Sequence, residues 1–465
     1  MISRSVPKNS NRWLAAFQDK EYIQKIYRLA LPITLQQLVW SGLNMVGLVM
    51  VGQLGEVPIA AVGLSNQVWF LLALILFGIN SGSAMFTAQY WGRDERLAIR
   101  KVLGIALALD VAVSILFMGV TFFIPHLVLR IFSTDPAVVA GGSQYLQIYG
   151  FSFIFAAIAF GYAAVLRSTG EVRIPIIINM GALSLNALLS YLLIFGVLGF
   201  PRLGVQGAAL SIVIARSMEC AALLFITYRR SLPAAVTLSD VRLIRLPFVT
   251  MLMKPITPVI LNELLWALGI TAYNVVYARI GTDSIAAMNI VSTIENVAMV
   301  VFIGLGNATA ILVGNNIGAG DREKAYRYAG RSLALGAVGG LLVGGLILLG
   351  SGFILQLYKV PPEVIFNAQR ALLVLALLLW LRATNIILFI GVFRAGGDTR
   401  LAFILDAVII WVVGVPLAFI GAFVLHLPVY WVYLLVLTEE LIKCCIGIWR
   451  YLSGRWIHDL SAVTG

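Results

Sequence analysis

The chain has few charged residues and few cysteines. Charged residues make up 12% of its 465 positions, whereas 60% are hydrophobic, and the mean hydropathy is +0.95. This composition lies outside the range of soluble globular proteins and is typical of membrane proteins. The three cysteines, Cys220, Cys444 and Cys445, all fall in apolar runs, which excludes a disulfide framework or a zinc site built from them.

The sequence also lacks the residue patterns of enzymes. Its three histidines, His126, His426 and His458, stand in predicted loops or the tail, and no nucleophile, base and metal-ligand constellation is visible. The glycine-rich run "GAVGGLLVGG" from Gly336 lies within an apolar segment and lacks the Lys-Ser/Thr of a phosphate loop, so it predicts close helix contact. We therefore expect no enzyme activity and no bound cofactor.

Long apolar runs dominate the sequence instead. A helix needs about 20 apolar residues to cross a bilayer, and β-barrel strands would be short alternating segments, which these are not. The sequence therefore predicts an all-α integral membrane protein with twelve transmembrane helices. Their predicted ranges are 29–50, 59–88, 102–124, 145–166, 174–199, 206–228, 255–279, 285–313, 330–355, 369–393, 401–425 and 430–451.

Basic residues are distributed unequally between the two sets of loops. Most of the 33 Lys and Arg residues fall at the termini and in every second loop, whereas the opposite loops hold only Arg130, Arg202, Arg279 and Lys359. Positive loops face the cytoplasm, which predicts a multi-pass cell membrane protein with both termini cytoplasmic. The net charge of +12 follows from these loops and suits anionic membrane lipids, so it does not indicate a nucleic acid partner.

The two halves of the chain repeat one another. "PITLQQLVW" from Pro32 recurs as "PVILNELLW" from Pro258, and "LGEVPIAA" from Leu54 recurs as "IGTDSIAA" from Ile280, both 226 residues later. "LRSTGEVR" from Leu166 recurs as "FRAGGDTR" from Phe393, 227 residues later. Six spans per copy place both copies in the same orientation, as in transporters built from parallel repeats.

This duplication divides the chain into five parts. We predict a cytoplasmic N-terminal segment with amphipathic character (1–28), a first six-helix lobe (29–228), a cytoplasmic linker (229–254), a second six-helix lobe (255–451) and a cytoplasmic tail (452–465). Nothing in the sequence requires more than a monomer.

Glu263 is a carboxylate within the apolar run "NELLWALG". It lies nine residues after Lys254, about 13 Å deep at helical rise, and has no basic residue three or four positions away. A charge at that depth requires a partner, a cavity or a function. Glu263 is either a protonated structural residue that bridges helices or a residue that binds H⁺ or Na⁺. In the first copy its position is occupied by Gln37, so packing alone does not demand the charge.

Other ionisable residues in the spans form two groups. Arg216 with Glu219 and Glu440 with Lys443 are spaced three apart, which predicts local ion pairs. Three acids have no partner on their own helix, and Arg382 is placed to reach one of them from another helix. These acids are Glu295, Asp110 and Asp406.

The duplicated loop motif "RAGGDT" from Arg394 favours a structural hinge, with Asp398 capping the next helix; a role in coupling is the alternative. Trp266 and its repeat counterpart Trp40 offer aromatic faces to an organic cation, although core packing explains a single Trp equally well.

These motifs, with "GQLGEVPIAAVGLSNQ", "FGINSGSAMFTAQYWGRDE" and "PRLGVQGAALS", resemble the multidrug and toxic compound extrusion (MATE) family in a bacterial branch, from about Leu29 to Tyr451. The resemblance implies two six-helix lobes in a V shape and export of organic cations in exchange for Na⁺ or H⁺. It implies cation coupling at Glu263, accompanied by Asp398. The first lobe keeps Asn44 and Asn186 but has Gly47 and Ser190 where relatives have acids, which shifts weight to Glu263.

We therefore expect a secondary antiporter for organic cations or drugs. Glu263, with Asp398, Glu295 and Asp406 as further candidates, would carry the coupling H⁺ or Na⁺. The substrate cavity would be lined by Gln37, Trp40, Asn44, Asn186, Asn262 and Trp266. The alternative is a flippase for lipid-linked precursors, which would be expected to have an Arg-rich cavity; the spans offer only Arg216 and Arg382.

Overall fold

The computed structural model describes residues 19–460, and the regular elements within that range are all helical. The first half contains α1 (Lys20–Gly52), α2 (Glu56–Gly92), α3 (Arg96–Phe123), α4 (Pro125–Arg130), α5 (Pro136–Tyr149), α6 (Ser152–Ser168), α7 (Arg173–Phe195) and α8 (Val205–Arg229). The second half contains α10 (Leu246–Ile280), α11 (Thr282–Gly318), α12 (Arg322–Gln356), α13 (Pro362–Ile386), η2 (Ile387–Arg394), α14 (Thr399–Phe403), η3 (Ile404–Val408), η4 (Ile410–Gly414), α15 (Val415–Phe419), η5 (Ile420–Val424) and α16 (Val429–Leu452). The short helix α9 (Leu238–Arg242) joins the halves.

The helices account for twelve membrane spans. Within residues 19–460, ten continuous helical segments are long and apolar enough to cross a bilayer, and α5 with α6, bent by 49°, makes another. The last, α16, is 24 residues long and carries Glu439, Glu440 and Lys443, which lower its hydropathy. The predicted count is confirmed, with longer spans than the sequence indicated.

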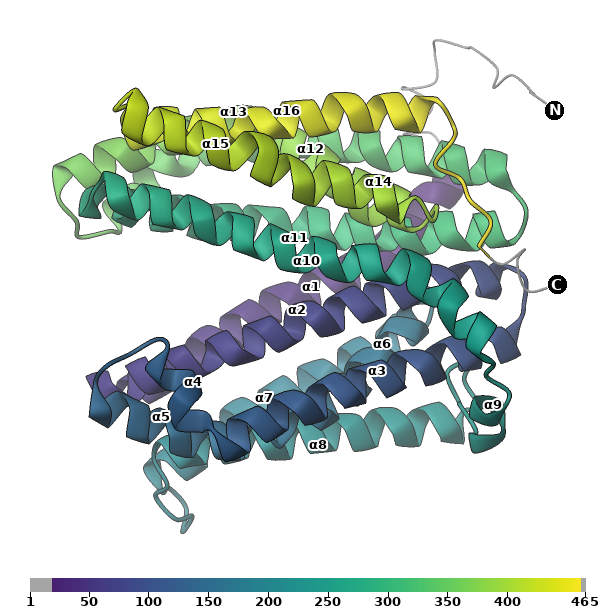
Figure 1. The fold of residues 1–465 in the computed structure, drawn as a ribbon, viewed down its shortest axis with the longest axis horizontal. Helices are drawn as coiled ribbons and strands as arrows, with labels where there is room; N and C mark the ends of the chain where they lie inside the picture. The colour runs from purple at the N-terminus through teal and green to yellow at the C-terminus, as the bar shows by residue number, and fades with distance from the viewer. Residues whose placement is uncertain (1–18, 461–465) are drawn as a thin grey trace.

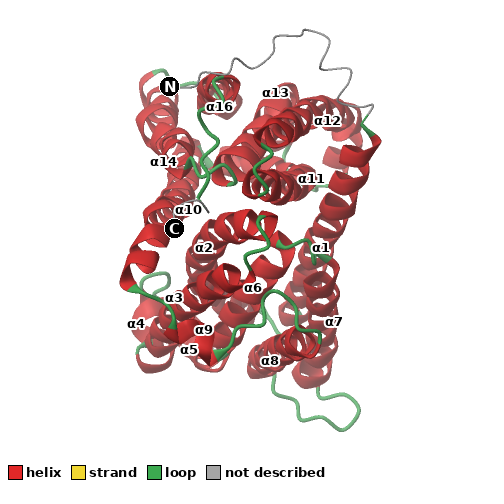
Figure 2. Cartoon of the chain, turned by 90° about the vertical axis from the view of Figure 1, so that its right-hand side faces the viewer, coloured by secondary structure: helices red, strands yellow, loops and turns green. Residues whose placement is uncertain are grey.

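The helices form two bundles, an N-lobe (α1–α8) and a C-lobe (α10–α16), each with its own hydrophobic core. The lobes lie close together at the end that holds both termini and diverge toward the other end (Figure 1). Viewed from the end that holds the termini, α1 and α10 lie on opposite flanks of the molecule, beside the boundary between the bundles (Figure 2). Across that boundary α2 packs against α10 and α11, and α1 packs against α11.

Glycines on α2 and α11 allow this close packing, and they occur at equivalent repeat positions. A Cβ added to Gly78 of α2 would lie 2.8 Å from the Ile260 Cα of α10. At the matching positions, a Cβ on Gly304 of α11 would lie 3.3 Å from the Thr34 Cβ of α1. Small residues let helices approach in a membrane, where lipid provides little hydrophobic drive for association. The two-fold relation between the copies is therefore built into the lobe boundary.

The one-residue change of register between the copies coincides with η2. Pro136 at the start of α5 and Pro362 at the start of α13 are 226 residues apart, whereas Arg167 near the end of α6 and Arg394 at the end of η2 are 227 apart. The second copy therefore contains one extra residue in this segment. A π-helical turn accommodates a single inserted residue without breaking the helix, and such turns are frequent at functional sites.

Both ends of the described chain tie the lobes together. The Asp19 carboxylate accepts hydrogen bonds from the Tyr22 backbone N–H and from Arg331 of α12, and these bonds lower the pKa of Asp19 below its ordinary value. At the other end, Arg93 of the N-lobe lies 2.6 Å from Asp459. Residues 20–28 of the predicted N-terminal segment form the first turns of α1; residues 1–18 lie outside the described range.

Candidate functional site

Glu263 forms a buried ion pair with Arg394. The Arg394 Nη2 donates to Glu263 Oε1 at 2.6 Å, and the two residues are 8% and 5% exposed. Arg394 also donates from Nη1 to Ser81 Oγ at 3.1 Å, and its guanidinium lies 5.9 Å from the Phe77 ring centroid. Glu263 belongs to α10 of the C-lobe, whereas Ser81 and Phe77 belong to α2 of the N-lobe. One guanidinium therefore contacts both lobes.

The sequence analysis placed Arg394 in a loop, whereas the structure places it at the last residue of the helix before that loop. Arg394 ends η2 and is buried, because η2 packs directly on α11: a Cβ on Gly391 would lie 2.9 Å from the Thr309 Cβ and 3.0 Å from the Gly306 carbonyl oxygen. This close approach brings the end of η2 to α10. Glu263 has no partner on its own helix, as predicted, and obtains one 131 residues later in the chain.

A second polar chain begins at Asn262, the neighbour of Glu263. The Asn262 amide donates to Asp406 Oδ2 at 2.8 Å, and Lys443 lies 3.9 Å from Asp406 Oδ1. Lys443 also donates to Glu439 Oε1 at 3.2 Å, and the Tyr273 hydroxyl donates to Glu439 Oε2 at 2.7 Å. Lys443 is only 2% exposed, so its charge is balanced by these acids rather than by water.

Glu295, another acid without a predicted partner on its own helix, is paired across helices. Glu295 forms an ion pair with Arg382 and accepts a hydrogen bond from the Tyr433 hydroxyl at 3.1 Å. The ammonium of Lys443 contacts Glu439, one turn earlier on α16, rather than the predicted Glu440. Glu440 instead accepts from the Asn385 amide at 2.6 Å.

The duplicated loop motif forms the turn between η2 and α14. Gly397 and its counterpart Gly170 both have positive φ, +78° and +87°, which explains the glycine in each copy. Asp398 occupies the N-cap position of α14, but its side chain makes no capping hydrogen bond, contrary to prediction. It accepts from Arg450 Nε at 2.7 Å and is buried, whereas its counterpart Glu171 is exposed.

The predicted N-lobe residues are more dispersed. Gln37 is half-buried on α1, and Trp40 and Asn44 are exposed on the same helix. Asn186 on α7 accepts from the Ser211 hydroxyl at 3.0 Å, and Ser190 shares a 2.6 Å hydrogen bond with Ser211.

The predicted pair of Arg216 and Glu219 is confirmed at 2.6 Å. Sequence reasoning missed Asn179 of α7, which links this pair to the first helix. It donates to Glu219 at 2.6 Å and accepts from Gln36 at 2.9 Å.

The sequence model of the MatE family matches residues 32–192 and 258–420, one segment in each lobe. The chain belongs to the MatE family. The MatE relatives are bacterial: the "Uncharacterized transporter YisQ" of Bacillus subtilis is 24% identical, with 95% of this chain and 96% of that protein covered. The "Probable multidrug resistance protein NorM" of Agrobacterium fabrum is 26% identical, with 91% and 90% covered.

Solved MATE structures have the same fold. A variant of the Vibrio cholerae MATE transporter VcmN superposes with a TM-score of 0.86 at 18% identity, over 97% of this chain and 99% of that one. The outward-facing conformation of a multidrug resistance MATE family transporter superposes with a TM-score of 0.84 at 19% identity, over 98% of this chain and 99% of that one. The resemblance predicted from the sequence is confirmed, and so is the two-lobe fold of twelve helices. As a MatE protein, the chain is a multi-span membrane transporter.

Sequence reasoning placed the most weight on Glu263 in this MatE protein but missed its partner Arg394. It also missed Glu439 and Tyr273, at the far end of the polar chain that begins at Asn262. The duplicated arginine of the loop motif, Arg167 in the first copy, was the available signal for Arg394.

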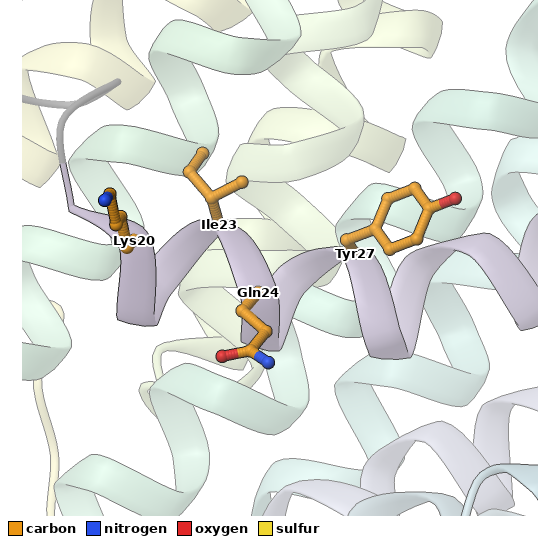
Figure 3. A pocket seen from close by; sticks show the side chains of 4 residues that line it. All are labelled: Lys20, Ile23, Gln24 and Tyr27. Atoms are coloured by element: carbon orange, nitrogen blue, oxygen red, sulfur yellow. The ribbon is translucent and has the colours of Figure 1, made fainter.

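A surface pocket of about 380 Å³ lies at the beginning of α1, lined by Lys20, Ile23, Gln24 and Tyr27 (Figure 3). Its lining comes from the first two turns of α1 in the N-lobe, whereas Glu263 lies on α10 of the C-lobe. Because it contains none of the buried acids described above, it is not part of the candidate site.

Proposed function

We propose that this protein is a secondary active efflux antiporter that exchanges organic cations for H⁺ or Na⁺. Its family membership, the multidrug resistance names of several relatives and a buried acid near the lobe boundary support this proposal. A membrane transporter that exports against a gradient requires an ion site whose occupancy changes the contacts between its moving parts.

The observation that carries the proposal is the double contact of Arg394. Its guanidinium binds Glu263 in the C-lobe and Ser81 in the N-lobe, so a change in the charge of Glu263 would alter a contact between the lobes. An H⁺ or Na⁺ that binds Glu263 competes with Arg394 for the same carboxylate. Once released from Glu263, Arg394 would change its contacts with Ser81 and Phe77 of α2, and the lobes would be free to rotate relative to one another. Cation binding is thereby linked to the exposure of substrate.

The Asn262 and Asp406 hydrogen bond adjoins this pair and provides a second element that responds to charge. Asp406 and Lys443 are neighbours in this chain of contacts, 3.9 Å apart, so an added cation at Glu263 would also change the charge balance around Asp406. Asp398 and Glu295 already pair with Arg450 and Arg382, which favours structural roles for them over direct ion binding.

The substrate path in this proposal lies between the diverging lobes. Trp40 and Asn44 of α1, with the half-buried Gln37, face out of the N-lobe core. Trp266 packs at the edge of the C-lobe core, and Asn262 and Asn186 are held by hydrogen bonds. Cytoplasmic termini would make the diverging ends extracellular, so the conformation described here would be open outward.

The first test is efflux of a fluorescent organic cation from proteoliposomes, driven in turn by an imposed Na⁺ gradient and by a pH gradient. We expect one gradient to drive efflux and Glu263→Gln to abolish it, because a neutral amide cannot exchange Arg394 for a cation. The matched control is Asp135→Asn, which changes an acid at the start of α5. Normal exchange by the Glu263→Gln protein would refute the mechanism.

The flippase alternative is not favoured. It called for an arginine-lined cavity, and the guanidiniums of Arg394, Arg382 and Arg216 all face carboxylates that neutralise them. Failure of both gradients to move any cation tested would remove the antiporter proposal itself.

A further inference from the structure

A buried acid that the proposed mechanism does not use lies inside the N-lobe. Asp110 stands near the middle of α3 and is fully buried. Its one described hydrogen bond comes from the Asn80 amide of α2, which donates to Asp110 Oδ2 at 2.8 Å. In the described part of the chain, Asp110 Oδ1, Asn80 Oδ1 and the Ser114 hydroxyl have no hydrogen-bond partner. Ser114 follows Asp110 by one helical turn, on the same face of α3.

Asp110 and Asn80 lie beside a glycine. A Cβ added to Gly161 of α6 would lie 3.5 Å from Asp110 Oδ2 and 3.6 Å from Asn80 Oδ1. The absence of a side chain at Gly161 therefore leaves α6 in contact with both polar groups. The carboxyl is enclosed by α2, α3 and α6 within the N-lobe, and its partner Asn80 directly precedes Ser81, the contact of Arg394 on α2.

The repeat provides an internal comparison for this cluster. The register of 226 residues holds at the start of α3, because its N-cap Glu95 matches the N-cap Asp321 of α12. Asn80, Asp110 and Ser114 then correspond to three glycines, Gly306, Gly336 and Gly340.

In the C-lobe, Ile387 stands in place of Gly161, and its Cδ1 lies where a Cβ on Gly336 would stand. The same helix packing is thus made without any polar group. The fold does not require an acid at Asp110.

No ionisable side chain in the described chain interacts with Asp110; the amide of Asn80 is its only partner. The elements that pack against α3 are α2, α4, α5, α6 and α9. Their charged side chains are Glu56, His126, Arg130, Arg167, Asp240 and Arg242, and their tyrosines are Tyr90, Tyr145, Tyr149 and Tyr162. The basic residues of α3 itself, Arg96, Arg100 and Lys101, lie nine or more residues away, at least about 13 Å along the helix.

We propose that Asp110 is a proton-binding residue of the N-lobe, held by Asn80 and independent of the Glu263 and Arg394 pair. In the protonated form, the O–H bond is at Oδ1, the oxygen that receives no hydrogen bond, and the carboxyl is neutral. On release, that bond breaks, the proton passes to water, and the carboxylate keeps the Asn80 amide and gains the Ser114 hydroxyl as donors. A neutral acid is the form that a site without a cation tolerates in a membrane.

Infrared difference spectroscopy of the purified protein in liposomes tests this site without any transport. We expect the wild type to show a protonated-carboxyl C=O band that disappears as the pH rises. Asp110→Asn, which keeps the size of the side chain, should lose this component. The control Asp135→Asn, at an exposed N-cap, should retain it.

A difference spectrum in which Asp110→Asn matches the wild type overturns the proposal. So does a band that added Na⁺ removes at constant pH, because that identifies a sodium site. Labelling of the wild type with an apolar carbodiimide, which forms an N-acylurea with protonated carboxyls, covers the case in which the variant fails to fold. We expect mass spectrometry to find the adduct at Asp110 with a yield that falls as the pH rises, and an equal yield at all pH values contradicts the proposal. These readouts succeed or fail independently of drug efflux.

Discussion

Removing the guanidinium of Arg394 should destabilise the protein because it strands a buried carboxylate. Arg394→Met keeps most of the length of the side chain but leaves Glu263, 8% exposed, without its cation and Ser81 without its donor. Removal of one partner from a buried ion pair typically costs about 3–5 kcal/mol, whereas replacing both charges by neutral groups is often nearly neutral. The double variant Arg394→Met with Glu263→Gln should therefore recover most of the stability that the single variant loses.

Thermal unfolding in detergent, followed by the fluorescence of the ten tryptophans, measures this rank order. We expect Arg394→Met to unfold at the lowest temperature, with the double variant close to the wild type. The matched control is Arg327→Met, which removes an exposed partner of Glu323 at 3.7 Å. Exposed pairs contribute at most about 1 kcal/mol, so this change should be small. If the single and double Arg394 variants unfold together, Glu263 carries no charge opposite Arg394 and the coupling argument loses its basis.

Three further changes test the lobe boundary and the chain ends. Gly78→Val should separate α2 from α10, lowering the unfolding temperature and transport, whereas Gly119→Ala, which has open space around its Cα, should leave both unchanged. Asp459→Asn should lower the free energy of unfolding by less than about 1 kcal/mol. It should nevertheless broaden the distribution of distances between spin labels on the two lobes, because it weakens the ion pair with Arg93. An unchanged distribution would show that this ion pair does not hold the lobes together. The hydrogen bonds from the Tyr22 backbone and Arg331 lower the pKa of Asp19, so the wild type should be more stable than Asp19→Asn above about pH 4. Denaturant titrations should show the difference in unfolding free energy vanishing as the pH falls further.

The spans and the duplication could be predicted because both are written in local sequence. Hydropathy over some 20 residues marks a helix in lipid regardless of its neighbours. The carboxylate of Glu263 was conspicuous for the same reason, since an acid in an apolar run is costly wherever the helix packs. The partner was not visible, because Arg394 lies 131 residues later and looked like one more basic residue of a short loop.

Lys443 shows why local spacing alone was insufficient. Both Glu439 and Glu440 lie within about one turn of it, and contacts with other helices decide between them: α16 packs against α13, and Tyr273 of α10 reaches it by a hydrogen bond. The Asn385 amide of α13 donates to Glu440, and the Tyr273 hydroxyl of α10 donates to Glu439. In this arrangement the Lys443 ammonium contacts Glu439. Side-chain partners inside a bundle depend on helix rotation, and a single sequence does not specify rotation.

The comparison of the two copies separates packing from chemistry. Gly78 and Gly304, which allow the lobes to touch, are kept in both copies, so the boundary about which the lobes would rock is symmetric. The buried acids are not kept: Glu263 matches Gln37, and Asp110 matches Gly336. The boundary is therefore symmetric, whereas each buried acid occurs in one lobe and has no acidic counterpart in the other. This arrangement favours motions driven by unequal charge changes in the two lobes. The two single variants Asp110→Asn and Glu263→Gln should therefore impair different steps of exchange. Identical defects of both variants in proton release and in substrate release would contradict separate roles for the two acids.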